Sequence, residues 1–263
     1  MANTLVAHTN SFHTHPFEAA LSGIAEAGFQ HVELSAVRGW TEHVDVDDDP
    51  APTVALLEQA GLQAVALSGH SDLTTDAGVS LAVRAIQWAA AAGLDRITTA
   101  IGGHAGQHEN LSDFLSRVAV VAESAARSEV VVALEVHGDI MATGLKSREL
   151  IERIGSDWVR IKYDTANVEF YGGVKAVDDI HHVLPYLVNV DAKDKRGGVG
   201  VWDFPPPGEG SIDWPRLIGI LRAGGYAGPV TVEIEFRGEP WPSPPEVTEA
   251  LRTARRTLEP LLA

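Results

Sequence analysis

The sequence of 263 residues contains no cysteine, which excludes disulfide bonds, thiolate metal sites and cysteine nucleophiles. Basic residues are scarce, because 20 Lys and Arg stand against 36 Asp and Glu and give a net charge of −16. Nucleic-acid phosphates are bound by clustered Lys and Arg, so no nucleic-acid partner is expected. No apolar run approaches about 18 residues, and the chain does not start with a cationic segment before an apolar one. We therefore expect a cytoplasmic protein with no membrane segment.

The chain contains a repeating unit. A helix end, a glycine and a strand follow one another in the segments 24–34, 56–67, 88–98 and 221–233. Gly28, Gly61 and Gly93 are 33 and 32 residues apart. A glycine at this point stops a helix in the left-handed conformation. Strands and helices that alternate with a period near 30 predict stacked βα units and a parallel sheet.

Period-2 and helical patterns predict eight strands and eight helical segments. The strands are Thr4–His8, His31–Ser35, Ala64–Ser68, Ile97–Ile101, Val130–His137, Val159–Asp164, Leu187–Ala192 and Val230–Glu235. The helices are Phe17–Ala27, Thr53–Ala60, Val79–Ala91, Leu111–Arg127, Ser147–Ile154, Asp178–Leu184, Trp214–Arg222 and Pro245–Leu262. Eight βα units in a chain of this length predict an α/β fold, a single-domain (β/α)8 TIM barrel over residues 1–263. A doubly wound open sheet is the alternative, but the segment after the first strand is not a Gly-rich phosphate loop.

Carboxylates stand near the C-terminal ends of four consecutive strands. They are Glu135, Asp164, Asp191 and Glu233, each on the charged face of its strand. Four converging carboxylates repel one another, so one or more would have to stay protonated. A bound divalent metal removes that conflict. An edge strand would give the charged face of 159–164 an ordinary explanation, whereas a barrel directs this face inward.

A wider polar set is expected at the same end of the barrel, where TIM-barrel enzymes carry their active sites. The candidates for substrate binding are His8, Glu33, His70, Asn167, Lys193 and Trp202. His137 joins Glu135 on one strand face, because Val136 is turned away between them. Each residue alone has an ordinary reading as a satisfied structural group or a solvated loop residue, and their joint placement is what indicates a site.

Several segments resemble one known family. They are Glu135-Val-His-Gly138, Tyr163-Asp-Thr-Ala-Asn167, Lys193-Asp-Lys195, Gly208-Glu-Gly-Ser-Ile-Asp213 and Val232-Glu-Ile-Glu235. The chain resembles the xylose-isomerase-like TIM barrels, the sugar phosphate isomerase/epimerase superfamily that also holds inosose dehydratases, hydroxypyruvate isomerases and endonuclease IV. The resemblance covers nearly the whole chain, is strongest from residue 130 onward, and is weak for the substrate.

The resemblance implies a metal held by Glu, Asp, His and Glu from strands five to eight. Glu135, Asp164 and Glu233 fit these positions, whereas the histidine position falls on Asp191. Four oxygen donors would favour Mn²⁺ or Mg²⁺ over Zn²⁺ and would carry a formal charge of −4, which Lys162 and Lys193 could offset. The departure leaves open a weaker site, or one in which Asp191 is not a ligand.

The implied function is a metal-dependent isomerase or epimerase of a keto-sugar or cyclic polyol. It would remove a proton alpha to a carbonyl and pass through a metal-bound enediolate. The resemblance assigns the acid and base roles to Glu135 and Glu233, and His137 is a second candidate base. The proline- and aromatic-rich segment 202–210, which contains Trp202, reads either as a stiff lid or as an ordinary surface loop.

Two other functions stay open. A lyase would use the same first step, as a dehydratase of a keto-inositol type substrate or in eliminating cleavage of a 3-oxo-glycoside. A catalytically weak sugar-binding subunit is the third reading, supported by Asp191 alone. The acidic charge disfavours an endonuclease. The expected partner is a small-molecule carbohydrate, with an unphosphorylated one favoured because no Arg/Lys cluster or Gly-rich loop marks a phosphate site. A homo-oligomer or a partner subunit stays open.

Overall fold

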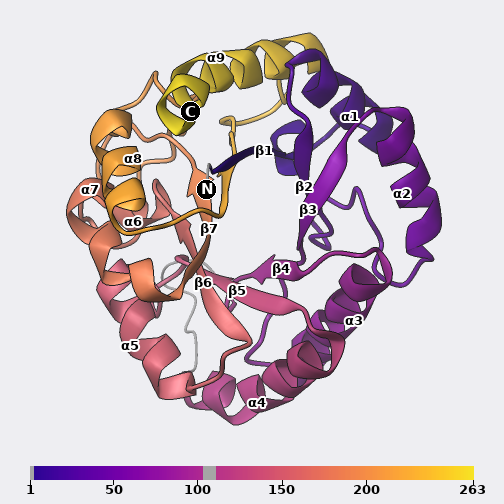
Figure 1. Cartoon of the computed structure of the whole chain (residues 1–263), viewed down its shortest axis with the longest axis vertical. Helices are drawn as coiled ribbons and strands as arrows, with labels where there is room; N and C mark the ends of the chain where they lie inside the picture. The colour runs from indigo at the N-terminus through magenta and orange to yellow at the C-terminus, as the bar shows by residue number, and fades with distance from the viewer. Residues whose placement is uncertain (1–2, 103–110) are drawn as a thin grey trace.

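The computed structural model describes residues 3–102 and 111–263. Eight parallel strands pair in chain order and close into a barrel, with β1 beside β8. The strands are β1 (Thr4–His8), β2 (His31–Ser35), β3 (Gln63–Ser68), β4 (Arg96–Thr99), β5 (Val131–Glu135), β6 (Val159–Asp164), β7 (Leu187–Ala192) and β8 (Pro229–Val232). Figure 1 shows the helices as a ring around these strands. The predicted TIM barrel is confirmed.

Helices follow the strands and cover the outer face of the barrel. They are α1 (Phe17–Glu26), α2 (Pro50–Gln59), α3 (Asp76–Ala91), α4 (Leu111–Ser128), α5 (Gly144–Ile154), α6 (Asn167–Phe170), α7 (Ala176–Asp179), α8 (Trp214–Ala223) and α9 (Pro244–Leu262). Local chemistry sets several of their ends. The Thr75 side chain accepts the N–H of Gly78 at the start of α3, and Gly155 ends α5 in the left-handed conformation with φ 67°.

Strands β1, β2, β6 and β7 have the bounds that the sequence pattern predicts, whereas three strands end earlier, among them β4, which stops at Thr99 and not at Ile101. β5 stops at Glu135 and β8 stops at Val232, because their last paired positions are Glu135 with Lys162 and Ala192 with Val232. The predicted helix over 178–184 was also wrong. A short α7 is followed by the 3₁₀ turns Ile180–His182 and Leu184–Tyr186, because Pro185 disfavours a helical residue before it.

The barrel interior holds a polar layer below the C-terminal mouth. Its members come from five strands and are Glu33, Thr98, Lys162, Asn189 and Thr231, all with 0% exposure. The carboxylate of Glu33 accepts from Thr98 Oγ1 at 2.6 Å, Lys162 Nζ at 2.8 Å, Asn189 Nδ2 at 3.0 Å and Thr231 Oγ1 at 3.0 Å. Four donors saturate this buried carboxylate, as burial without water requires.

The loop after β7 is tied down by one aspartate. Asp194 accepts the backbone N–H groups of Gly208, Gly210 and Ile212 and the indole N–H of Trp214, at 2.8, 3.1, 3.1 and 2.9 Å. A Cβ on Gly210 would lie 2.0 Å from Asp194 Oδ1, so a glycine is required there. The two sequence segments 193–195 and 208–213 therefore act as one unit that holds the intervening loop in place.

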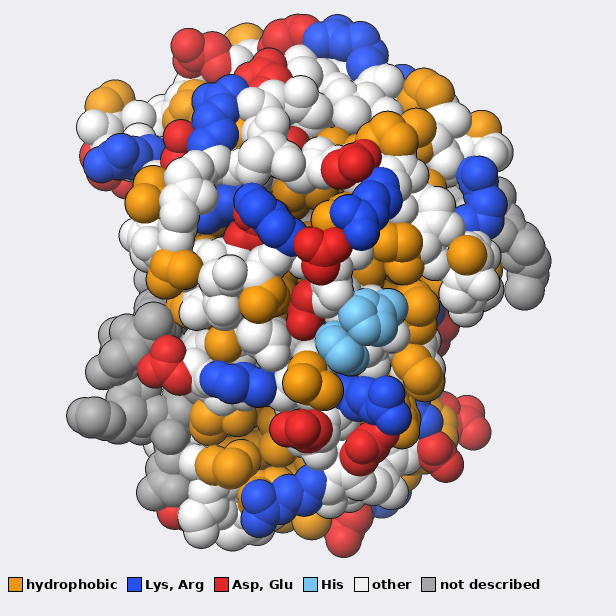
Figure 2. Space-filling view, turned by 90° about the vertical axis from the view of Figure 1, so that its left-hand side faces the viewer, with side chains coloured by type: hydrophobic (Ala, Val, Ile, Leu, Met, Phe, Trp, Pro, Cys, Tyr) orange, Lys and Arg blue, Asp and Glu red, His pale blue; other side chains and the backbone are white. Residues whose placement is uncertain are grey.

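The outer surface carries charges of both signs. Figure 2 shows Lys or Arg next to Asp or Glu at many points of the face that it displays. Arg216 of α8 pairs with Asp178 at 2.8 Å, and Arg148 pairs with Glu152 on α5 at 2.8 Å. Within residues 3–102 and 111–263, no helix has the length and apolar character that crossing a bilayer needs.

Candidate active site

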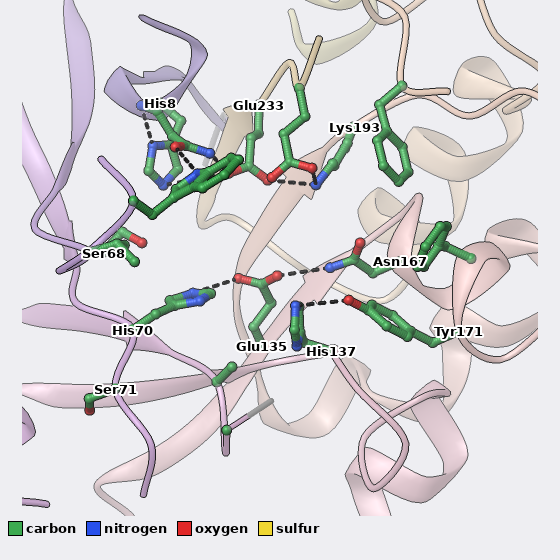
Figure 3. A pocket seen from close by; sticks show the side chains of 18 of the residues that line it. His8, Ser68, His70, Ser71, Glu135, His137, Asn167, Tyr171, Lys193 and Glu233 are labelled. Carbon is green, nitrogen blue, oxygen red and sulfur yellow. Dashed lines mark hydrogen bonds and ion pairs between the residues drawn. The ribbon is translucent and has the colours of Figure 1, made fainter. Parts of the chain in front are cut away.

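A cavity of about 410 Å³ opens at the C-terminal mouth of the barrel, on the side where the strands deliver their polar residues. Eight of the residues predicted from the sequence line it: His8, His70, Glu135, His137, Asn167, Lys193, Trp202 and Glu233. Figure 3 shows Glu135 and Glu233 reaching the cavity from two sides, each with neighbours that hold its carboxylate. The parallel strands bring these residues together because all their C-terminal ends share one rim.

Glu135, the last residue of β5, is held by the side chains of His70 and Asn167. Its Oε2 lies 3.0 Å from His70 Nε2, and its Oε1 accepts from Asn167 Nδ2 at 2.9 Å. Burial alone would raise the pKa of Glu135, but His70 and Lys162 beside it hold that pKa well below its usual range. Glu135 is therefore an oriented, ionised carboxylate at the cavity wall.

Asp164 and Asp191 lie just below the cavity and are fully buried. Asp164 Oδ1 accepts the N–H groups of Ala166 and Asn167 at 2.8 and 2.9 Å, which sets the turn that begins α6. Its Oδ2 and both Asp191 oxygens have no hydrogen-bond donor among the described residues. Asp191 Oδ2 does have an ion-pair partner, Lys162 Nζ, at 2.9 Å.

These oxygens, which lack hydrogen-bond donors, suit a divalent cation. Glu135, Asp164 and Asp191 each offer one carboxylate oxygen, and the three atoms lie within 4.8 Å of one another. Burial, together with the charges of Glu135 and Glu233, raises the pKa of Asp164 to about 8 although Lys193 lowers it. Burial likewise raises the pKa of Asp191 well above its usual range, against the opposing charge of Lys162. Buried carboxylates without donors fit a hard metal ion, which would supply the missing charge.

Glu233, just past β8, stands outside that group of three in the described structure. Its Oε1 accepts from Asn10 Nδ2 at 3.0 Å, and its Oε2 lies 3.2 Å from Lys193 Nζ. Lys193 also pairs with Glu235 at 2.8 Å and with Asp164 at 3.6 Å. Burial would raise the pKa of Glu233, yet Lys193 and His8 bring it below its usual value. To reach a metal at the other three carboxylates, Glu233 would have to leave Lys193.

The histidines at the mouth have defined neighbours. His8 Nδ1 accepts the backbone N–H of Asn10 at 3.0 Å, so a neutral His8 carries its proton on Nε2, which lies 3.7 Å from Glu33 Oε1. Burial lowers the pKa of His8, which favours this neutral form. His137 Nε2 lies 3.0 Å from the Tyr171 hydroxyl in a hydrogen bond, and both residues line the cavity.

A family model described as xylose isomerase-like TIM barrel matches residues 21–257. The chain belongs to this family. Among curated proteins, the L-ribulose-5-phosphate 3-epimerase UlaE of Escherichia coli K12 is 24% identical over 172 residues, which are 64% of this chain and 60% of that protein. The chain thus matches under two thirds of the length of this relative.

Solved structures of the same fold include two sugar epimerases. The D-allulose 3-epimerase of Methylomonas sp. in complex with D-allulose superposes with a TM-score of 0.76 at 18% identity, covering 97% of this chain and 96% of the other. The 3-keto-D-glucoside 4-epimerase YcjR of E. coli gives 0.75 at 19% identity, covering 97% and 99%. At these identities the likeness establishes the fold.

One residue of this xylose isomerase-like barrel lies away from its expected place. Glu33 does not reach the cavity wall, because it sits in the polar layer below with all its donors inside the barrel. Glu33 is therefore not among the residues that line this cavity, and its role in substrate binding stays a prediction. β2 turns Glu33 inward as the strand pattern indicates, but residue alternation does not give depth along the barrel axis.

Sequence reasoning missed residues that complete the wall. Asn10, Tyr171 and Glu235 all line the cavity. Glu235 shares a strand face with Glu233 in the sequence pattern, and Tyr171 follows Asn167 at the spacing of one helical turn. The sequence could therefore have indicated both residues as part of the cavity wall. Asn10 follows β1 in the 3₁₀ turn Thr9–Phe12, for which the sequence had no clear marker.

Proposed function

We propose that this protein is a metal-dependent isomerase or epimerase acting on a keto-sugar or cyclic polyol by removing a proton alpha to a carbonyl. One observation carries the proposal: Glu135, Asp164 and Asp191 gather oxygens within 4.8 Å of one another at the base of a cavity of about 410 Å³. The sugar-epimerase relatives support this substrate class, and the composition of the walls supports proton transfer.

The metal ligands in this proposal are Glu135, Asp164, Asp191 and Glu233, with Mn²⁺ or Mg²⁺ as the ion because all four donors are carboxylate oxygens. A divalent ion held there supplies Lewis-acid polarisation of a substrate carbonyl. Lys162 is a fixed positive charge beside two of these residues, 2.9 Å from Asp191 and 3.7 Å from Glu135. Glu233 would have to give up its contact with Lys193 to serve as the fourth ligand.

Proton transfer falls to residues on the cavity wall. Glu135 and Glu233 are the acid and base pair, because they approach the cavity from two sides (Figure 3). Both have lowered pKa values, so either can accept the proton from the carbon as an ionised base, and the other must carry a proton to return one as the acid. A base and an acid on different sides of a planar enediolate are what inversion at a carbon requires. His137 is the second candidate base, next to Glu135 and held by Tyr171. His70 and Asn167 orient Glu135, and Lys193 is placed to hold a substrate oxygen.

Solvent-deuterium exchange tests this function. The protein, purified without chelator and analysed for metal, is incubated in D₂O with a panel of ketoses and 3-keto-glycosides, and the sugars are read by NMR and mass spectrometry. We expect metal-dependent deuterium at the carbon alpha to the carbonyl and formation of the epimer or isomer. Loss of water or of an aglycone in place of an isomer would identify a lyase that shares the first step. No exchange with any sugar, in protein loaded with Mn²⁺ or Mg²⁺, would overturn the proposal and favour a sugar-binding subunit.

A further inference from the structure

Positive charge is nearly absent from the cavity wall. Among the described residues that line it, Lys193 is the one Lys or Arg, whereas Asp72, Glu135, Glu233 and Glu235 are acidic. A phosphate group is bound by Arg or Lys side chains or by free N–H groups at a helix start. This wall instead repels a dianion.

Lys193 has little capacity left for an anion. Its ammonium lies within 2.8 to 3.6 Å of Glu235, Glu233 and Asp164 and 4.6 Å above the ring centre of Phe204. A phosphate that recruited Lys193 would leave two buried carboxylates and the partly buried Glu235 without their counter-charge. A single neutral hydroxyl or carbonyl oxygen can share Lys193 without that penalty.

Aromatic side chains form the outer part of the cavity. We call Trp40, Phe170, Tyr171, Trp202 and Phe204 the aromatic rim; all five line the cavity. Trp40 is 44% exposed although it is a large apolar side chain, and its ring stacks on His13 at 3.8 Å between centres. Trp202 contacts Phe170 and Phe204 edge to face, with centres 6.1 and 5.2 Å apart. Such faces gain most from a flat, apolar partner that removes them from water.

The aromatic rim is held rigidly. Trp40 Nε1 donates to Asn10 Oδ1 at 3.0 Å, and Asn10 in turn donates to Glu233. The loop that carries Trp202 and Phe204 is fixed at its base by Asp194, and Lys195 Nζ donates to the carbonyl of Val201 at 2.7 Å. Binding a ligand against fixed rings loses little conformational entropy.

From the scarcity of cations and the aromatic rim together, we propose that the substrate is an uncharged keto-glycoside whose aglycone is flat and apolar and lies against the aromatic rim, with Trp40 and Trp202 among its contacts. The oxidised sugar ring then rests on Glu135 and Glu233, and the aglycone points outward. This inference rests on the proposed function, because the position of the sugar ring is taken from the carboxylates to which that function assigns proton transfer. It separates this chain from relatives named as phosphate-sugar epimerases.

Two matched probe pairs test it, with Kd measured by calorimetry on protein loaded with Mn²⁺. D-fructose is compared with D-fructose 6-phosphate, and methyl 3-keto-β-D-glucoside with its 4-nitrophenyl counterpart. We expect the phosphate to weaken binding and the nitrophenyl group to strengthen it, each by about tenfold or more, since aromatic contact is worth roughly one power of ten. Trp40→Ala and Trp202→Ala should each remove most of the nitrophenyl advantage. Leu145→Ala, a remote exposed residue on α5, is the matched control and should keep it.

Tighter binding of the phosphorylated sugar, or a nitrophenyl advantage that is absent or survives both tryptophan substitutions, would overturn this inference. Solvent-deuterium exchange separates that result from failure of the proposed function. Exchange that proceeds best with phosphorylated sugars would keep the function and reject the neutral glycoside. Exchange with none of the sugars would reject both.

Discussion

Two buried lysines near the C-terminal end of the barrel occupy comparable positions but have different surroundings. Lys162 precedes Asp164 by two residues, and Lys193 follows Asp191 by two residues. Each approaches three carboxylates: Glu33, Asp191 and Glu135 surround Lys162, and Glu233, Glu235 and Asp164 surround Lys193. Lys162 is wholly enclosed, whereas Lys193 lines the cavity.

The two clusters differ in access to the cavity and in the satisfaction of one partner, Glu33, although each also contains a carboxylate oxygen without a hydrogen-bond donor, on Asp191 beside Lys162 and on Asp164 beside Lys193. In the Lys162 cluster, Glu33 has four donors, and its pKa is about 2 because the charges of Lys162 and His8 outweigh the effect of burial. In the Lys193 cluster, burial and the charge of Glu233 raise the pKa of Glu235 despite Lys193, and Asp164 Oδ2 lacks a hydrogen-bond donor. A closed ion cluster stabilises the barrel, while an open one retains the capacity to exchange partners for a ligand.

The largest effect is expected at Glu135, which belongs to the cavity and also lies 3.7 Å from Lys162. Glu135→Gln should abolish metal occupancy and lower turnover by roughly 10²–10⁴-fold, because it removes a ligand charge and a proton acceptor. Asp164→Asn should lose metal as well. Metal analysis, circular dichroism and turnover check this, and unchanged metal content in both folded variants would show that the ligand assignment is wrong.

A substitution at His137 tests proton transfer separately from metal binding. His137→Ala should keep the metal and lose roughly 10²–10⁴-fold in turnover if it acts as the base. Tyr171→Phe, which removes only the hydroxyl 3.0 Å from His137 Nε2, is the milder companion variant. Near-normal solvent exchange at the substrate α-carbon in His137→Ala would leave the role to Glu135 and Glu233.

The lysines themselves provide the direct comparison. Lys162→Met should lower the free energy of unfolding of the metal-free protein by about 3–5 kcal/mol, because it strands Glu33, Asp191 and Glu135 without their shared cation. Added Mn²⁺ should then raise the Tm of this variant more than that of wild type. Lys193→Met should be less destabilising and should mainly impair substrate binding. Equal losses of stability in the two variants would contradict the division into a closed and an open cluster.

Metal binding should depend on pH through Asp164. Its pKa near 8 means that the metal-free protein holds a proton there at lower pH, and the metal must displace it. Because the folded state raises the pKa of this acid, the metal-free protein is more stable when Asp164 is protonated. Its free energy of unfolding falls as pH rises towards 8. Affinity for Mn²⁺ should therefore fall roughly tenfold or more for each pH unit below 8. Calorimetry in buffers of different ionisation enthalpy should detect released protons, and pH-independent affinity would refute this.

The smallest effect is expected for one donor within the closed cluster. Thr231→Val removes the hydroxyl 3.0 Å from Glu33 with little change in shape and leaves three donors to the carboxylate. We expect a loss of about 1 kcal/mol in the free energy of unfolding and normal turnover. A large loss of turnover with little loss of stability would mean that the polar layer takes part in the chemistry.

The sequence by itself determined the fold and the identity of several polar residues of the cavity wall. Strand alternation and the glycines that end several helices are local signals, so β1, β2, β6 and β7 were predicted to the residue. Because all parallel strands of a barrel end at one rim, strand-end residues such as His70, Asn167 and Lys193 could be assigned to one cavity before any coordinates.

Only the tertiary structure decided depth and partnership. Glu33 and Glu233 have the same side chain, and both point inward. Glu33 is buried below the cavity that Glu233 lines, because the stagger between strands sets the height of each residue along the barrel axis. Likewise, Lys162 meets Glu33 across 129 positions of the chain. The choice of which carboxylate each lysine neutralises depends on distances between strands, and local sequence patterns do not contain them.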